Sequence, residues 1–179
     1  SYNVAIGHNT LETNTTGASN VGVGDGVLNA NAASNNTAVG HRAMLSNTTG
    51  TNNVAVGAYA LDANTTTNSN TAVGYGALTA NTAAENTAVG VSALEDNTTG
   101  TRNTAMGVDA LQECTTGNDN TAFGYNALEN PTTASDNTAV GSYALTANTT
   151  GAQNTAVGLN ALLSNTTADA NTAVGYIAL

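Results

Sequence analysis

Residues 137–153 read Asn-Thr-Ala-Val-Gly-Ser-Tyr-Ala-Leu-Thr-Ala-Asn-Thr-Thr-Gly-Ala-Gln, and this pattern recurs along the whole chain. Each copy begins with Asn and carries Gly at its fifth position, and the copies follow one another every 16 or 17 residues. Ten copies are full (residues 3–170), and the eleventh (171–179) stops after nine residues. A regular short period predicts stacked, near-identical units, so residues 1–179 are expected to form one repeat domain.

The first four residues of each copy, Asn-Thr-Ala-Val, have the alternation of a strand, with positions two and four on one face. We expect the fifth-position Gly to end this strand and the Asn-Thr-Thr-Gly segment to form a turn. The Ala-Leu pair at positions eight and nine is expected to form a second short strand. The sequence therefore predicts an all-β parallel β-solenoid of about eleven coils, because a helical hairpin repeat needs about twice this length.

Stacking of the coils places equivalent residues in columns along the axis. We expect the first-position asparagines to form a side-chain ladder in which each amide donates to the next. The ladder residues are Asn3, Asn20, Asn36, Asn53, Asn70, Asn86, Asn103, Asn120, Asn137, Asn154 and Asn171. The turn glycines are Gly7, Gly24, Gly40, Gly57, Gly74, Gly90, Gly107, Gly124, Gly141, Gly158 and Gly175. Ala at position three and Val at position four lie on opposite faces, and the sequence leaves open which face is the interior.

Composition and charge exclude several classes of partner. The chain carries 2 basic and 12 acidic residues, a net charge of −10, which argues against binding to nucleic acid or to an anionic membrane surface. No apolar run approaches the ~18–20 residues of a membrane span, so no membrane insertion is expected. The single Cys114 cannot form an internal disulfide.

No constellation of catalytic or metal-binding residues is found in the sequence. His8 and His41 both fall at the variable sixth position, and no Ser or Cys nucleophile is tied to them by spacing. There is no Cys/His cluster and no acidic calcium loop. We therefore expect no enzyme activity, no metal and no cofactor.

Tyrosines follow the turn glycine in five copies and are the best candidates for a binding surface. These residues are Tyr59, Tyr75, Tyr125, Tyr143 and Tyr176. Aromatic rings along one exposed edge suit stacking on sugars, whereas the same rings can also cover the edges of coils or a contact between chains. Six Asn-Thr-Thr sequons occur, beginning at Asn14, Asn47, Asn64, Asn97, Asn148 and Asn165.

The motif Asn-x-Ala-Val/Ile-Gly, followed by Ala-Leu and an Asn/Thr/Gly turn, resembles the head repeats of trimeric autotransporter adhesins of the YadA-like type. It is closer still to the Asn-Thr-Ala-Val-Gly-Tyr-x-Ala-Leu repeats of bacteriophage tail-fibre proteins. The resemblance covers residues 3–179. It implies a left-handed β-roll, a homotrimer, and a role in surface attachment outside the cell, on a virion fibre or a cell surface.

These observations predict a non-catalytic shaft or head that presents a rigid, multivalent repeat array to a host surface glycan or protein. Neither end carries a cap, so the chain is expected to be a segment of a longer fibre. A purely structural extracellular filament or spacer is the first alternative. A monomeric ice-binding solenoid is the second, because the second-position threonines form a column (Thr37, Thr71, Thr87, Thr104).

Overall fold

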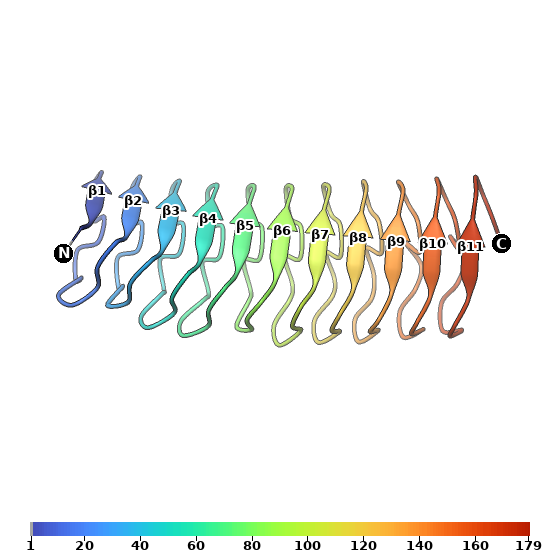
Figure 1. The fold of residues 1–179 in the computed structure, drawn as a ribbon. Helices are drawn as coiled ribbons and strands as arrows, with labels where there is room; N and C mark the ends of the chain where they lie inside the picture. Colours follow the sequence, from blue (N-terminus) through green and yellow to red (C-terminus); the bar gives the residue numbers. More distant parts are fainter. Residues whose placement is uncertain (1) are drawn as a thin grey trace.

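The computed structural model describes residues 2–179, which wind into one parallel β-solenoid (Figure 1). Each coil contributes one three-residue strand, and the chain advances by one coil per repeat. The strands are β1 (Val4–Ile6), β2 (Val21–Val23), β3 (Thr37–Val39), β4 (Val54–Val56), β5 (Thr71–Val73), β6 (Thr87–Val89), β7 (Thr104–Met106), β8 (Thr121–Phe123), β9 (Thr138–Val140), β10 (Thr155–Val157) and β11 (Thr172–Val174). They form one eleven-stranded sheet in sequence order, which confirms the predicted fold class.

The strand register keeps equivalent residues aligned from coil to coil. Ala72 lies beside Ala88 and Val73 beside Val89, and the same pairing holds along the sheet. The 16-residue coil that begins at Asn20 keeps this register, because Gly22 still pairs with Ala38. A shorter final turn therefore leaves the strand register intact. At about 4.8 Å per coil, the rod is about 50 Å long.

Backbone hydrogen bonds join neighbouring coils around the perimeter and not only in the sheet. Leu61 N–H donates to Ala77 O and Ala63 N–H donates to Thr79 O, each at 3.0 Å. In the opposite direction along the axis, Tyr59 N–H donates to His41 O at 2.9 Å. Because these bonds occupy the polar groups of the turns as well, the coil is held on all sides although its strands are short.

The predicted second strand at Ala-Leu is wrong. Every ninth-position residue has a left-handed backbone, with φ between +48° and +60°, and the segment is a series of turns. This conformation costs about 1–2 kcal/mol for a non-glycine residue. Burial of a Leu side chain contributes about 1.5–3 kcal/mol, which offsets that cost. Leu also lacks the β-branch that would make a positive φ most unfavourable.

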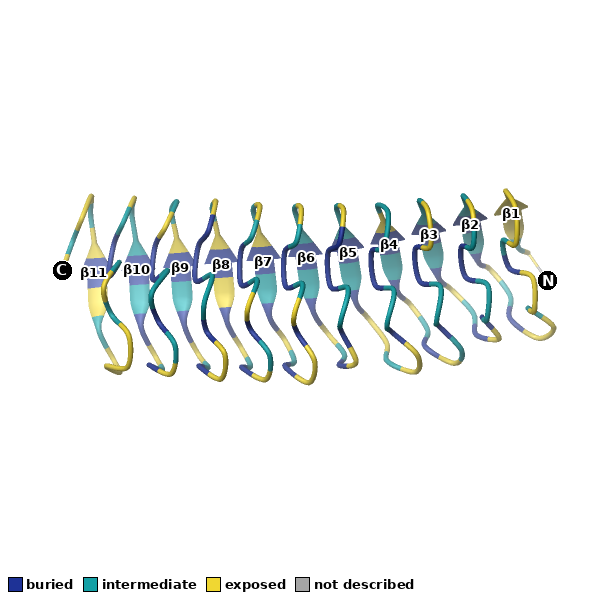
Figure 2. Cartoon of the chain, turned by 180° about the vertical axis from the view of Figure 1, so that it is seen from behind, coloured by how far each residue is buried: buried dark blue, intermediate teal, exposed yellow. Residues whose placement is uncertain are grey.

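The core is formed by the two Ala columns and the Leu column. Ala38, Ala43 and Met44 of one coil are fully buried, and the equivalent residues of the other coils join the same core cluster. Figure 2 shows the buried residue as a dark band across the middle of the strands from β2 to β11. The structure thus assigns the third-position Ala face to the interior, and the second- and fourth-position side chains face outward.

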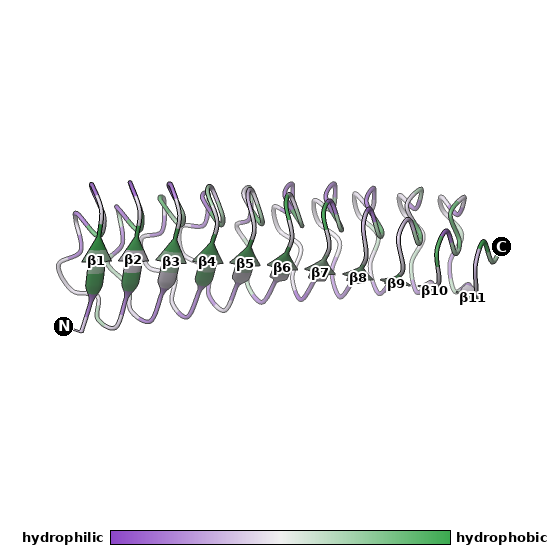
Figure 3. Ribbon diagram, turned by 90° about the horizontal axis from the view of Figure 1, so that it is seen from above, coloured by the Kyte–Doolittle hydropathy of each residue, from purple (hydrophilic) through white to green (hydrophobic). Residues whose placement is uncertain are grey.

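The outer face of the sheet is a continuous row of Thr and Val side chains. Its larger members are well exposed: Ile6 by 60%, Phe123 by 54% and Met106 by 38%. In Figure 3, apolar colour is clear on β1 and β2, where Val occupies the second position. No charged residue lies at the second or fourth position of any copy of the repeat. We call this surface the Thr–Val face.

Candidate functional site

The first-position asparagines are the main polar link between coils, as predicted, although most links run from the backbone. The predicted amide-to-amide bond is present where Asn120, Asn137 and Asn171 each donate to the ladder residue of the preceding coil, at 3.1–3.2 Å. Asn36 N–H donates to Asn20 Oδ1 at 2.9 Å, and Asn53 N–H donates to Asn36 Oδ1 at 3.0 Å. The Nδ2 of Asn36 donates to Gly50 O in its own coil at 2.8 Å. The Oδ1 of each side-chain amide therefore accepts a backbone N–H of the next coil. Its Nδ2 donates to a carbonyl in the final turn of its own coil.

A second asparagine ladder lies at the twelfth position and was missed by the sequence interpretation, which treated these residues as turn formers. Here amide bonds to amide: Asn47 donates to Asn31 Oδ1 at 2.7 Å, and Asn64 donates to Asn47 Oδ1 at 2.9 Å. The signal was present, because Asn occupies this position in eight of the ten copies that reach it, and Cys114 and Pro131 are the two exceptions. The preference of Asn for turns was enough to explain the residue type, so the burial of these asparagines was not predicted.

The amide-to-amide bonds of the second ladder run in short stretches, which join Asn31, Asn47 and Asn64, then Asn81 and Asn97, then Asn148 and Asn165. Between the last two stretches, Cys114 and Pro131 replace Asn. Asn97 Oδ1 is buried and has no hydrogen-bond partner, because the next coil offers a thiol instead of an amide. The Cys114 Sγ lies 3.7 Å from Gly117 O. Burial raises the pKa of the Cys114 thiol to about 11, which leaves it protonated and unreactive near neutral pH.

The sequon asparagines mostly belong to this second ladder. Asn47, Asn64, Asn97 and Asn148 are fully buried, and their side chains are bonded within the coil. A glycan on any of these nitrogens is incompatible with the fold, because the amide has no access to solvent.

The turn glycines are required for two reasons at once. Gly107 has φ +145°, which L side chains rarely adopt, and a Cβ built there lies 2.2 Å from Gly124 O of the next coil. The other glycines of the column, up to Gly158, make the same close approach to the coil that follows them. The backbones of successive coils therefore meet at this corner with no room for a side chain.

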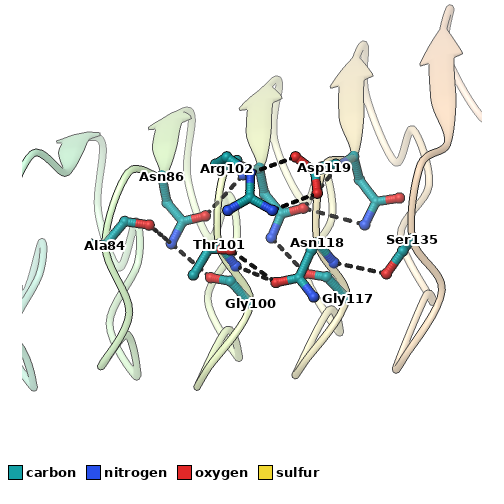
Figure 4. A network of polar contacts seen from close by, with 11 residues as sticks. Ala84, Asn86, Gly100, Thr101, Arg102, Gly117, Asn118, Asp119 and Ser135 are labelled. Atoms are coloured by element: carbon teal, nitrogen blue, oxygen red, sulfur yellow. Dashed lines mark hydrogen bonds and ion pairs between the residues drawn. The ribbon is translucent and has the colours of Figure 1, made fainter.

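The final turn carries a polar column of its own. Asn118 Oδ1 accepts the Thr101 N–H at 2.8 Å, and Ser135 Oγ accepts the Asn118 N–H at 3.0 Å (Figure 4). Beside it, Arg102 forms a two-pronged ion pair with Asp119, at 2.6 and 2.7 Å. The side chains of this turn therefore bond one coil to the next.

The five candidate tyrosines lie along one edge, next to the turn glycines, but they do not form an even stripe. Tyr59 and Tyr75 pack edge to face with ring centroids 5.9 Å apart, and His41 packs on Tyr59 at 5.3 Å. Tyr125 and Tyr143 form a separate edge-to-face pair at 5.3 Å. Tyr176 lies apart from both groups in the last coil. We call this surface the tyrosine edge.

Charged side chains accompany the tyrosine edge. Asp25 contacts His8 Nδ1 at 2.9 Å and His41 Nδ1 at 3.3 Å. The Arg42 guanidinium lies over the Tyr59 ring, 5.7 Å from its centroid, and 3.8 Å from Asp62. Burial raises the pKa of Asp62, against the attraction of Arg42 and His41, and its Oδ1 has no hydrogen-bond partner.

Within residues 2–179, no group of three or more His, Cys, Asp or Glu side chains is arranged to hold a metal ion. The described part of the chain also holds no helix long and apolar enough to cross a membrane. The pocket at the C-terminal end of the rod is lined by Leu162, Leu179 and neighbouring polar residues, and is the open interior of the last coil.

Comparison with protein-family models, with curated proteins and with solved structures finds no match to this chain. The structure itself shows a parallel β-solenoid of about 17 residues per coil, in which two sets of asparagines link the coils.

Proposed function

We propose that the chain is a non-catalytic shaft or head segment of an extracellular fibre, in which left-handed coils of three identical chains lie side by side. The observation that carries this proposal is the Thr–Val face: a long, uncharged surface of Thr and Val side chains on a protein with a net charge of −10. Such a fibre attaches to a surface on the host through repeated weak contacts.

The size of the Thr–Val face supports association between chains. Eleven strands at about 4.8 Å, each about 10 Å wide, give about 500 Å². The largest apolar patch on a monomeric protein is about 300–600 Å² and is often functional, so the Thr–Val face is of the size of a functional patch. A second copy of this chain fits the face well, because both surfaces repeat at the same spacing and neither carries a charge at the contact.

The ladders support a mechanical role. Every coil is tied to the next by backbone bonds and by first-position amides, and several pairs of coils are tied by final-turn side chains as well, which supports a rigid rod. A rigid array holds equivalent contact points at fixed distances, and simultaneous engagement of several weak points multiplies affinity by avidity. The tyrosine edge is the surface we assign to such contacts, with a host surface glycan or protein as the partner.

The test is the solution mass measured by light scattering, together with circular dichroism. The expected mass is three times that of one chain. The double variant Phe123→Lys with Val140→Lys places charges on the Thr–Val face and is expected to give a folded monomer, because an unpaired charge cannot be buried at the contact. The matched control, Val91→Lys with Val108→Lys, changes side chains of similar exposure on the tyrosine edge and is expected to remain a trimer.

A folded monomer for the unmodified chain contradicts the multi-chain proposal. That outcome favours the second candidate, ice binding, because it leaves open a face on which a Thr column and a Val column repeat in register. Thermal hysteresis measured on the same sample tests it. If the chain is a trimer and binds none of the glycans on a glycan array, the structural spacer is the function that remains.

A further inference from the structure

Tyr125 and Tyr143 form a close pair of rings that joins two successive coils of the tyrosine edge. Their ring centroids lie 5.3 Å apart, and the ring planes are nearly perpendicular, at 86°. Tyr125 is the sixth residue of its copy of the repeat, and Tyr143 is the seventh residue of the next copy. The stacking of the coils therefore holds together two phenol rings that are separated by one full coil in the sequence.

The hydroxyl groups of this pair also lie together. The hydrogen bond with Tyr143 is the largest cause of the raised pKa of Tyr125. The two ortho carbons of a phenol flank the carbon that carries the hydroxyl, so contact between the hydroxyls brings ortho carbons of the two rings near each other. Ortho carbons are the atoms at which oxidised phenols join.

Both rings are open to solvent and able to turn. Tyr125 is 48% exposed and Tyr143 is 37% exposed, and exposed side chains change rotamer within picoseconds to nanoseconds. The other pair, Tyr59 with Tyr75, is wider, with centroids 5.9 Å apart, and the ring of His41 also packs on Tyr59. Tyr125 and Tyr143 are therefore the pair that is better placed to react.

Few other side chains of the protein compete for an oxidant. The chain contains no Trp, and its single thiol, Cys114, is fully buried. Met44 is also fully buried, and Met106, which is 38% exposed, takes up an oxygen atom at its sulfur when it is oxidised. Removal of single electrons from this protein is therefore directed to its tyrosines.

We infer that Tyr125 and Tyr143 are a crosslinking site, at which hydrogen peroxide and a peroxidase join the two rings as dityrosine. The peroxide, acting through the peroxidase, takes one electron and one proton from each hydroxyl and is reduced to two molecules of water. The two phenoxyl radicals pair to form a carbon–carbon bond between ortho carbons. The hydrogen on each of these carbons then moves to the phenoxyl oxygen, which restores both hydroxyls. The product has lost two hydrogen atoms, and two coils are covalently joined.

Dityrosine is a covalent link between coils that this composition permits. The chain has no Lys and a single Cys, so it forms neither an isopeptide bond through lysine nor an internal disulfide. A bond between coils closes a loop in the unfolded chain and stabilises the fold in that way, as a disulfide does. The site goes beyond the proposed fibre role and does not depend on it, because both rings belong to one chain.

The test treats the purified protein with a peroxidase and hydrogen peroxide and maps the products by mass spectrometry. Cleavage of the chain after Glu129 separates Tyr125 from Tyr143 unless the two rings are joined. The expected product is a pair of linked fragments from a single chain, lighter by two hydrogen atoms and with dityrosine fluorescence. The inference is overturned if the two tyrosines are not linked, or if they are linked only to another chain.

Two phenylalanine variants separate pairing from exposure. Tyr143→Phe keeps the ring but has no hydroxyl from which hydrogen is lost, and it is expected to abolish the linked fragments. Tyr176→Phe is the matched control, because it removes a tyrosine of 72% exposure that belongs to neither pair, and it is expected to leave the yield unchanged. An equal loss in the two variants overturns the inference, because exposure alone then governs the reaction. Circular dichroism shows that each variant is folded.

Unfolding the chain before the reaction tests the role of coil stacking. In urea, the six tyrosines are expected to react without preference for Tyr125 with Tyr143. A preference for this pair that survives unfolding overturns the inference, because the stacked coils then do not select it.

Discussion

Asn97 donates its amide N–H to Asn81 Oδ1 across 2.7 Å, while its own Oδ1 is buried without a partner. The second ladder therefore runs into the coil of Cys114 and stops there. A buried acceptor left unbonded costs about 1–3 kcal/mol, so the missing hydrogen bond lowers the stability of the rod at this coil.

Cys114→Asn together with Pro131→Asn is expected to stabilise the protein by about 1 kcal/mol, because the amide at position 114 donates to Asn97 Oδ1 and the amide at position 131 donates to the next oxygen in turn. Cys114→Asn alone only moves the unbonded acceptor to position 114, since Pro131 offers no donor. Thermal and denaturant unfolding measure the gain. The control, Cys114→Asp with Pro131→Asn, has the same shape but presents an acceptor to an acceptor, and it is expected to destabilise the protein. Equal effects of the two double variants would show that the amide donor is irrelevant.

Gly107→Ala is expected to destabilise the protein strongly, by more than about 3 kcal/mol, because it adds the cost of a disfavoured backbone to a direct clash with Gly124 O at 2.2 Å. Gly76→Asn is the matched control. Gly76 has φ +67°, which Asn tolerates, and its Cβ would meet no atom closer than 3.5 Å. The melting temperatures of both variants test this prediction. A similar decrease in melting temperature for the two variants would show that the backbones at Gly107 and Gly124 do not approach closely enough to exclude a side chain.

Leu111→Asp is expected to abolish folding of its coil, because it puts a carboxylate into a fully buried column. Glu113→Gln, two residues away on the exposed side of the coil, is expected to change stability by less than about 0.5 kcal/mol. Circular dichroism and urea titration compare them. A destabilised Glu113→Gln variant would place an unrecognised contact at that side chain.

Asp62→Asn is expected to stabilise the protein at pH 7 and not at pH 3. The pKa of Asp62 is raised in the folded state by burial, so ionisation destabilises the fold as pH rises through and above the usual Asp range. Below that range both states are protonated and the carboxylate carries no penalty. The gain is under about 1 kcal/mol, because solvent screens the group. Melting curves at the two pH values test the sign, and a gain that grows at low pH would reverse it.

Asp119→Asn is expected to show the opposite pH dependence. The hydrogen bond and charge of Arg102 lower the pKa of Asp119, so its stabilisation is present above the ordinary Asp pKa and is lost as pH falls through the lowered value. The variant should melt below the unmodified chain at pH 7 and together with it at the lowest pH. Raising the salt concentration at pH 7 should narrow the difference, and a salt-independent difference would point to a cause other than the ion pair.

The repeat by itself determined the parallel stack, the number of coils, the alternation of the Asn-Thr-Ala-Val strand and the positions of the glycines. These follow from sequence because any residue that recurs at a fixed period must occupy the same environment in each coil. The same regularity predicted that the asparagines at position one would link successive coils.

Only the tertiary structure decided which face is the interior, because the alternation of Ala and Val allows either assignment and the Leu column selects one through packing. It also replaced the expected second strand by left-handed turns: the burial of Leu111 and its equivalents outweighs the cost of a positive φ, and no local propensity predicts that balance. The amide ladder through Asn31, Asn47 and Asn64 depends on inter-coil distances in the same way. Contacts such as Arg42 on Tyr59 depend on residues that vary from coil to coil, so they exist only once the coils are stacked.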